Sequence, residues 1–340
     1  MIDLRSDTVT RPTSMMLKAM MGAEVGDDVL DHDPTVQELE DLAAGMVGHE
    51  AGLFCPSGTM TNQVAVKVHT RPGDEIICEQ GSHVYRYEGG GMGFNSGCSI
   101  RLVEGDRGRI YPEHILENIN PDDVHHPRTS LVVIENTCNR GGGSYYTLEQ
   151  VRTLSETAHG MHLRIHLDGA RLFNALAETG ESARDHGVCF DSVSICLSKG
   201  LGAPVGSVLI GPEAFIKEAK RVRKLFGGGM RQSGYLAAAG IYALKNNIER
   251  LGEDHRRAKE LETVLRNLEY VKEVMPVDTN ILVFRIKDEY KDVVFLEKLK
   301  EKGLLAIGFG PQTIRMITHL DFTDEMLGTV KTILKGIQLP

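Results

Sequence analysis

Short apolar runs alternate with longer stretches of mixed polarity through the first two thirds of the chain. Many of the stretches between the runs have the spacing or the end signals of helices. Apolar strands that alternate with helices are typical of a mainly parallel sheet covered on both faces. The seven strands predicted for this sheet span residues 51–55, 75–78, 99–103, 131–134, 163–167, 192–197 and 206–210.

Two helix starts carry clear signals. Asp33 followed by Pro34 is an acidic N-cap with proline at the first helical position. Thr147 and Gln150 have the spacing of a capping box. A longer helical region is predicted over residues 213–268, with an interruption at the glycines 227–229.

The pattern changes in the last quarter of the chain and predicts a second, smaller domain. Apolar runs at 280–286, 304–308 and 313–317 surround a helix near 293–302, and a last helix begins at Thr323. We therefore expect a large domain over residues 1–245 and a small α+β domain over 246–340. The first 30 residues carry several breakers and are expected to form an irregular arm of the large domain.

Composition narrows the class of protein. The chain has 340 residues, 41% hydrophobic and 25% charged, with a formal net charge of −9. This balance argues against nucleic-acid or anionic-membrane partners, and no apolar run reaches the roughly 18 residues of a membrane span. The N-terminus carries charges where a signal peptide is apolar. The six cysteines form no C-x-x-C pair, as expected for reduced thiols in a cytoplasmic protein.

Asp168 and Lys199 indicate the chemistry. Each ends an apolar, strand-like run and is followed by small residues. A lysine can form a Schiff base with an aldehyde, and an acid can pair with a protonated pyridine nitrogen. This is the arrangement of pyridoxal 5'-phosphate enzymes, which stabilise a carbanion at an amino-acid Cα.

Two further segments fit that cofactor, although each has a plainer explanation. Gly58 and Thr59 follow a predicted strand and open a helix, where an anion such as phosphate is favoured; alone, an ordinary helix cap explains them better. His83 follows another strand at the edge where α/β sheets bind ligands. An imidazole there can stack on a pyridine ring or move protons, but a lone histidine is more often structural.

Two arginines are candidates for binding a carboxylate. Arg171 follows Asp168 by three residues, so we expect it near the cofactor, where it can bind a substrate carboxylate bidentately. Arg315 stands among apolar residues on a predicted strand, and is either a surface residue or a pocket cation.

Other chemistries find little support. Neither G-x-x-x-x-G-K-[ST] nor H-E-x-x-H occurs in the sequence. His162 and His166 lie on one face of a predicted strand with Arg164 between them, a poor neighbour for a dication. No metal is therefore expected. His166 shares its face with Asp168 and is expected to support it.

Taken together, these residues resemble the low-specificity L-threonine aldolases, a pyridoxal-phosphate family of the aspartate-aminotransferase fold (fold type I). The resemblance runs nearly end to end. It rests on Asp3-Leu4-Arg5-Ser6-Asp7-Thr8-Val9-Thr10, Pro56-Ser57-Gly58-Thr59-Met60, Ile134-Glu135-Asn136-Thr137, His166-Leu167-Asp168-Gly169-Ala170-Arg171, Leu197-Ser198-Lys199-Gly200-Leu201, Ala203-Pro204-Val205-Gly206-Ser207 and Gly227-Gly228-Gly229-Met230-Arg231-Gln232.

The resemblance implies a role for each candidate. Lys199 would be the Schiff-base lysine, Asp168 the partner of the pyridinium nitrogen, and His83 the residue stacked on the ring. Phosphate would be bound by Gly58 and Thr59, with Arg231 from a neighbouring subunit. The substrate carboxylate would be bound by Ser6, Arg171 and Arg315, while His125 and Glu88 would lie near the substrate hydroxyl.

The implied reaction is retro-aldol cleavage of L-threonine or L-allo-threonine to glycine and acetaldehyde. His125, or a water that it holds, is our first choice for the base, with His83 and Glu88 as alternatives. The family implies a homotetramer, a dimer of dimers with sites at the dimer interface. Leu30 departs from a tyrosine that is common in relatives, in a segment that approaches the substrate.

Three alternatives remain open at this stage. A β-eliminating lyase or an aminotransferase of the same fold would share Asp168 and Lys199 but release ammonia or consume a keto acid. A non-catalytic protein that binds the vitamer could dispense with carboxylate-binding arginines. Arg171 and Arg315 are both present, which favours an amino-acid substrate.

Overall fold

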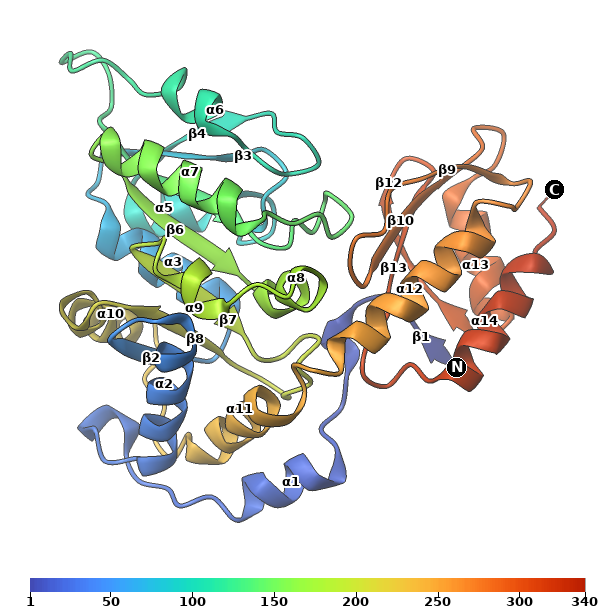
Figure 1. The fold of residues 1–340 in the computed structure, drawn as a ribbon, viewed down its shortest axis with the longest axis horizontal. Coiled ribbons are helices and arrows are strands. Elements are labelled where there is room, and N and C mark those ends of the chain that lie inside the picture. The colour runs from blue at the N-terminus through green and yellow to red at the C-terminus, as the bar shows by residue number, and fades with distance from the viewer. Residues whose placement is uncertain (340) are drawn as a thin grey trace.

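A seven-stranded sheet forms the centre of the large domain in the computed structural model, which describes residues 1–339 (Figure 1). β8 is antiparallel to both of its neighbours, β2 and β7, and the remaining pairs are parallel. The predicted mainly parallel sheet is thereby confirmed. In spatial order the strands are β2 (Ala51–Cys55), β8 (Ser207–Gly211), β7 (Ser192–Cys196), β6 (Arg164–Gly169), β5 (Thr129–Glu135), β3 (Glu75–Glu79) and β4 (Ser99–Val103).

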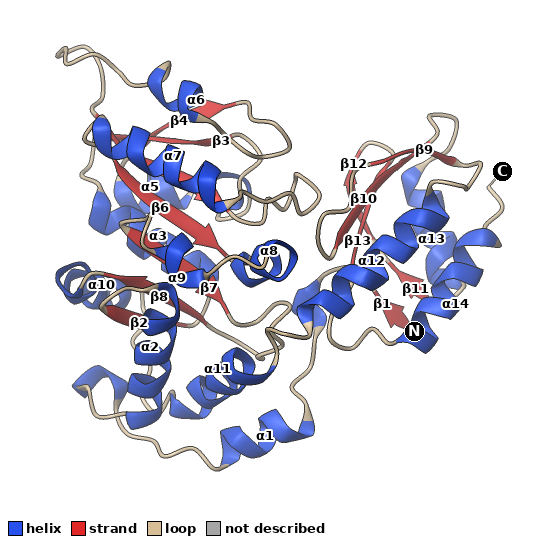
Figure 2. Cartoon of the chain, viewed as in Figure 1, coloured by secondary structure: helices blue, strands red, loops and turns tan. Residues whose placement is uncertain are grey.

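Helices cover both faces of this sheet (Figure 2). Side chains from α2, α7, α8 and α11 pack with Ile165, Leu167, Val193 and Ile195 in the main core. The helices of the large domain are α1 (Ser14–Met21), α2 (Pro34–Val47), α3 (Gly58–His69), α4 (His83–Arg86), α5 (Gly91–Ser96), α6 (Pro112–Leu116), α7 (Leu148–Gly160), α8 (Leu172–Thr179), α9 (Ala183–Gly187), α10 (Glu213–Leu225) and α11 (Gly234–Asn246).

The opposite face of the sheet differs in character because part of it is polar. α3 and α10 pack on Leu53, Cys55 and Leu209 at one end of the sheet. In the middle, His166 and Asp168 alternate with the apolar core residues of β6, so both point away from the main core. They form hydrogen bonds to Ser192 and to residues of α3. This polar layer leads to the carboxyl end of β6.

The predicted helix starts are confirmed. The Asp33 carboxylate accepts a hydrogen bond from Val36 N at the start of α2, where Pro34 is the first helical residue. Thr147 and Gln150 form a capping box at the start of α7. The predicted long helical region contains three helices, α10, α11 and α12 (Leu251–Leu265).

The small domain has a separate antiparallel sheet, with the strand order β12-β13-β10-β9. Its core gathers apolar residues of this sheet and of three helices. The strands are β9 (Val271–Val274), β10 (Ile281–Ile286), β12 (Ile307–Gly310) and β13 (Thr313–Ile317); the helices are α12, α13 (Asp292–Glu301) and α14 (Asp324–Lys335).

The N-terminal segment differs from the irregular arm expected for it. It contains the helix α1, where the Thr13 hydroxyl accepts from Met16 N. It also begins with β1 (Ile2–Asp3), which pairs in parallel with β11 (Leu304–Leu305), and Leu4 is buried in the core of the small domain. The proposed boundary at residue 246 stays a prediction.

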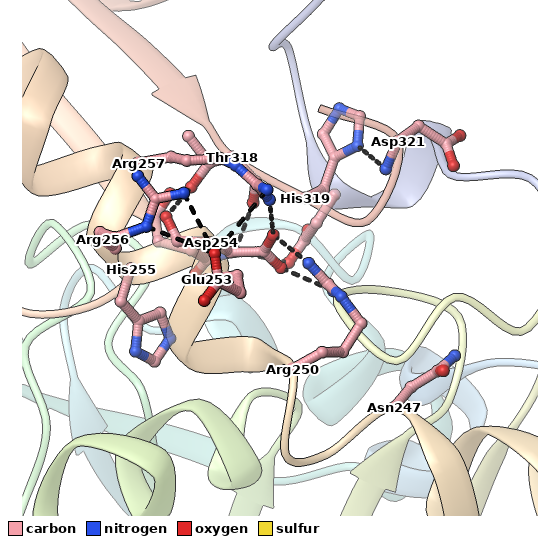
Figure 3. A network of polar contacts seen from close by, with 12 residues as sticks. Asn247, Arg250, Glu253, Asp254, His255, Arg256, Arg257, Thr318, His319 and Asp321 are labelled. Atoms are coloured by element: carbon pink, nitrogen blue, oxygen red, sulfur yellow. Dashed lines mark hydrogen bonds and ion pairs between the residues drawn. The ribbon is translucent and has the colours of Figure 1, made fainter. Parts of the chain in front are cut away.

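A polar network joins α12 and the segment after β13 (Figure 3), and His319 in that segment also contacts the N-terminal segment. Arg250 forms an ion pair with the buried Asp254, and Thr318 Oγ1 donates to the Asp254 carbonyl at 2.7 Å. His319 Nε2 lies 2.7 Å from the Asp3 carbonyl oxygen. Nearby, Asn247 donates to the carbonyl of Leu201, two residues after Lys199. These contacts link the small domain to the N-terminal segment and to the loop that follows Lys199.

Among residues 1–339, no helix is long and apolar enough to cross a membrane. All six cysteines are buried as free thiols.

Candidate functional site

The parallel strands β3, β5, β6 and β7 end at one edge of the large sheet, and the sequence-predicted residues gather there. In Figure 1 the arrowhead of β6 points toward the small domain. A cavity of about 390 Å³ lies at this edge. It is lined by Ser6, Thr8, His83, Tyr87, Asn139, Arg140, Arg171, Lys199, Ile307, Gly308, Phe309 and Arg315. The structure thus brings together five of the residues selected from sequence: Ser6, His83, Arg171, Lys199 and Arg315.

Asp168 is buried just behind this cavity, at 2% exposure. Its carboxylate accepts from Asn62 Nδ2 at 3.0 Å and from Ala170 N at 3.2 Å. His166 reaches the same asparagine, with Nε2 3.2 Å from Asn62 Oδ1. Burial lowers the pKa of His166 to about 4, so this histidine is neutral near pH 7. The expected support of Asp168 by His166 therefore runs through Asn62.

His83 and Glu88 form the side of the site nearest Asp168. His83 Nδ1 lies 3.1 Å from Glu88 Oε1, which also accepts from Asn62 Nδ2 at 2.9 Å. Burial alone would lower the pKa of His83, but the Glu88 hydrogen bond and the Asp168 charge raise it above its ordinary value. Ligand atoms of His83, Glu88 and Asp168 lie within 4.8 Å of one another. Asn62 already links both carboxylates, so the group forms one hydrogen-bonded unit.

Arg171 meets a carboxylate that the sequence analysis did not select. Its Nε and Nη2 each donate to Asp7 at 2.7 Å. The Asp7 carboxylate is fully buried, which alone would raise its pKa, but the charge and hydrogen bonds of Arg171 hold that pKa well below the ordinary range. Two guanidinium nitrogens of Arg171 are thus committed to Asp7, while the residue still lines the cavity.

Arg315 has a different environment. Nη1 donates to Asn139 Oδ1 at 2.8 Å and Nη2 to the Arg5 carbonyl at 3.1 Å. Within residues 1–339, its buried Nε has no hydrogen-bond partner and the guanidinium forms no ion pair. Burial and the nearby Arg171 charge lower its pKa to about 10. A half-buried guanidinium that lines a cavity and lacks an ion-pair partner is a site for an anion.

Gly58 and Thr59 are the first two residues of α3, whose N-cap is Ser57. A Cβ on Gly58 would lie 3.5 Å from Ser207 Oγ. Among the described residues this hydroxyl is buried without a hydrogen-bond partner. A helix N-terminus beside an unpaired buried hydroxyl suits a phosphate group. These observations fit the predicted phosphate site.

Two of the predicted residues that do not line the cavity are exposed in the single chain. His125 is on the loop after α6, with an 83% exposed side chain that contacts Asp123. In Figure 1 this loop projects from the side of the large domain away from the small domain. Arg231 is 62% exposed and paired with Asp27. It lies near Leu30, also exposed. Their roles at a site stay predictions.

Four supporting residues were missed by the sequence analysis: Asp7, Asn62, Glu135 and Asn139. Each acts by holding another side chain or backbone group across a long sequence separation. Asp7 and Asn139 reach Arg171 and Arg315 over 164 and 176 positions. Asn62 has the one local signal, since it lies in the first turns of α3 next to Gly58 and Thr59.

Comparison with known proteins agrees with this geometry. Residues 3–289 match the family described as beta-eliminating lyase. The chain is 45% identical to the low specificity L-threonine aldolase of Escherichia coli K12 over 97% of both chains. It is 40% identical to low-specificity L-threonine aldolase 1 of Arabidopsis thaliana, over 95% of this chain and 92% of the relative.

Solved structures agree as well. The Leishmania major threonine aldolase structure superimposes with a TM-score of 0.84 at 20% identity, over 98% of this chain and 99% of that one. At this identity the likeness concerns the fold, and it confirms the predicted fold class.

Proposed function

The chain belongs to the beta-eliminating lyase family, and we propose that it cleaves L-threonine or L-allo-threonine to glycine and acetaldehyde. Relatives named as low-specificity L-threonine aldolases match it along nearly its whole length. The observation that carries the proposal is Arg315, a half-buried guanidinium that forms no ion pair within residues 1–339 and lines the same cavity as Lys199. Such a cation fits the carboxylate of an amino-acid substrate.

Pyridoxal 5'-phosphate is the proposed cofactor. Gly58, Thr59 and Ser207 would bind its phosphate, Asp168 would hold the ring nitrogen protonated, and Lys199 would bond to its aldehyde. The cofactor supplies an electron sink for the pair of electrons released when the Cα–Cβ bond breaks.

The protein then has three tasks of its own. Arg171 and Arg315, with Ser6, bind the substrate carboxylate. This fixes the Cα and selects which of its bonds aligns with the electron sink. The second task is to hold Asp168, and Asn62 together with neutral His166 would fix its carboxylate in a buried setting, where its effect on a bound ring is strong.

The third task is to take the proton from the substrate hydroxyl. His83 is the group within the single chain that best supports this role, because it lines the cavity and its Nδ1 is held by Glu88. His125, the base that the sequence favours first, would have to act from a neighbouring subunit. Cleavage by His125→Asn and His83→Asn proteins with normal cofactor loading distinguishes the two: the variant that loses turnover identifies the base.

The proposed assembly is a homotetramer, a dimer of dimers with sites at the dimer interface, in the cytoplasm. Arg231 and His125 support it, since both are exposed in the single chain. Light scattering of the purified protein measures the assembly, and a monomeric, fully active protein would overturn it.

Product analysis tests the proposed reaction. Purified protein loaded with cofactor is incubated with L-threonine, and acetaldehyde, glycine, ammonia and keto acid are measured. The proposal requires equal amounts of acetaldehyde and glycine. Ammonia with 2-oxobutanoate would make the protein a β-eliminating lyase, and consumption of an added keto acid would make it an aminotransferase.

A further inference from the structure

Glu135 is a buried carboxylate between the two ends of the cavity, and the proposed mechanism does not use it. It is the last residue of β5, at 7% exposure. Oε2 accepts from His83 N at 3.1 Å and Oε1 accepts from Asn139 N at 3.1 Å. One side chain therefore holds the backbone of two loops that follow different strands, β3 and β5.

The two residues held in this way serve opposite ends of the site. The imidazole of His83 contacts Glu88 beside Asp168. The amide of Asn139 accepts from Arg315 Nη1 at 2.8 Å. Glu135 is also the register partner of Asp168 in the β5–β6 pair. Glu135 and its two hydrogen bonds thus connect His83, at the end proposed to bind the cofactor ring, with Arg315, at the end proposed to bind the substrate carboxylate.

We propose that Glu135 is a positioning residue that fixes His83 and Arg315 relative to each other without touching the substrate. It does not line the cavity itself, whereas His83, Asn139 and Arg315 do. The inference rests on the proposed function, because it assumes that an amino-acid carboxylate binds at Arg315.

The role requires the ionised form of Glu135. A carboxylate accepts at both oxygens, whereas a carboxylic acid presents an O–H to one of the two N–H groups. Burial and the charge of Asp168 raise its pKa to about 7, against the opposing effects of Asn139 N and His83. The charged or titratable groups that face it are Asp168 from β6, His83 from α4, Arg171 at the start of α8 and Cys138. The hold of Glu135 on His83 and Asn139 should therefore weaken as pH falls through about 7.

The test is glycine binding by the cofactor-loaded protein, measured by calorimetry, for wild type, Glu135→Gln and a matched control. Glu40 provides the control: it is half-buried, accepts from Phe54 N at 2.7 Å, has a pKa raised to about 7 and lies outside the cavity. At about pH 8 the dissociation constant for glycine should be about tenfold higher in Glu135→Gln than in wild type, because one hydrogen bond to a charged group is lost. The ratio should approach one at about pH 6, where wild-type Glu135 is protonated.

Glu40→Gln should bind glycine as wild type does at both pH values. Glu135→Gln should also raise KM for threonine more than it lowers kcat. Asn139→Ala keeps the Glu135–His83 contact but removes the side-chain contact with Arg315. It should reproduce the loss of glycine affinity, and it tests the connection from Glu135 to Arg315 if Glu135→Gln does not fold. Glycine affinities of Glu135→Gln and Asn139→Ala equal to that of Glu40→Gln would overturn the inference. Glycine binding requires no cleavage of a carbon–carbon bond. A wild-type protein that binds glycine but does not cleave threonine would therefore contradict the proposed function and not the inference about Glu135.

Discussion

Asp7 and Arg171 form a buried, bidentate ion pair although 164 positions separate them in the sequence. Asp7 lies just after the strand that pairs with the small domain, and Arg171 caps α8 of the large domain. Asn280 of the small domain also donates to Asp7, at 3.4 Å. One carboxylate therefore couples Arg171, which is proposed to bind the substrate, to the relative position of the two domains.

Asp7→Asn should destabilise the protein and weaken substrate binding. Removal of one partner leaves Arg171 buried and unpaired, which costs on the order of 3 kcal/mol of unfolding free energy. KM for threonine should rise at least tenfold, because the guanidinium is free to reorient. Urea unfolding and steady-state kinetics measure the two effects.

Asp3→Asn is the matched control on the same segment. Asp3 pairs with Arg5 at the surface, where the Arg5 side chain is 51% exposed. Loss of such a pair should cost under about 1 kcal/mol and leave KM unchanged. Equal effects of the two substitutions would show that Asp7 has no special role.

Arg315→Lys should separate substrate binding from cofactor binding. A lysine keeps the charge but cannot form the bidentate contact that a carboxylate makes with guanidinium. KM for threonine should rise about tenfold or more, with cofactor loading unchanged in the absorption spectrum. Arg285→Lys, on the adjacent strand β10 and paired with Asp288 at the surface, should behave as wild type. An unchanged KM in Arg315→Lys would place the carboxylate elsewhere.

Glu88→Gln should lower the pKa of His83, because the hydrogen bond that His83 makes to the Glu88 carboxylate raises that pKa in the wild type. His83 is protonated below its pKa, so the loss of cleavage at acidic pH should move to lower pH. Histidine NMR titration gives the pKa directly. Glu79→Gln is the control, since Glu79 accepts from Gly81 N in the same loop. A His83 titration unmoved by Glu88→Gln would contradict this account.

Glu40→Gln should alter the pH dependence of stability. Burial raises the pKa of Glu40 to about 7 in the folded state, so the native protein holds this proton more tightly than the unfolded chain. The contribution of this bound proton to the free energy of unfolding is fully present below the ordinary glutamate pKa and is lost as pH rises through about 7. Relative to wild type, Glu40→Gln should therefore gain up to roughly 3 kcal/mol between about pH 5 and about pH 8. Urea unfolding at both values measures this, and a constant difference would refute the shift.

The fold could be predicted to a large extent because its signals are local. Strand–helix alternation, the proline after Asp33 and the capping box at Thr147 each act within a few residues, and all appear in the structure. The N-terminal segment could not be assigned in the same way. Its two-residue strand β1 is determined by pairing with Leu304 and Leu305, which no local pattern encodes.

The candidate site likewise contains residues with local sequence signals and residues placed only by tertiary contacts. Lys199, His83 and Arg171 follow strands or precede helices, so their position at the sheet edge follows from topology. Their partners Asp7, Asn62 and Glu135 are set by tertiary contacts, and a buried carboxylate in a sequence looks no different from an exposed one. His125 and Arg231 lie outside the cavity, and a subunit interface leaves no periodic signature in the chain that contributes to it.

The most direct test of the central claim is acetaldehyde release from L-threonine by wild type and by Lys199→Ala, each supplied with pyridoxal 5'-phosphate. The account predicts stoichiometric acetaldehyde and glycine from the wild type and a rate at least a thousandfold lower from the variant, because covalent catalysis is lost while Asp168 and both arginines remain. Cleavage by Lys199→Ala at a rate near that of wild type would contradict it, as would a cofactor-loaded wild type that leaves threonine intact.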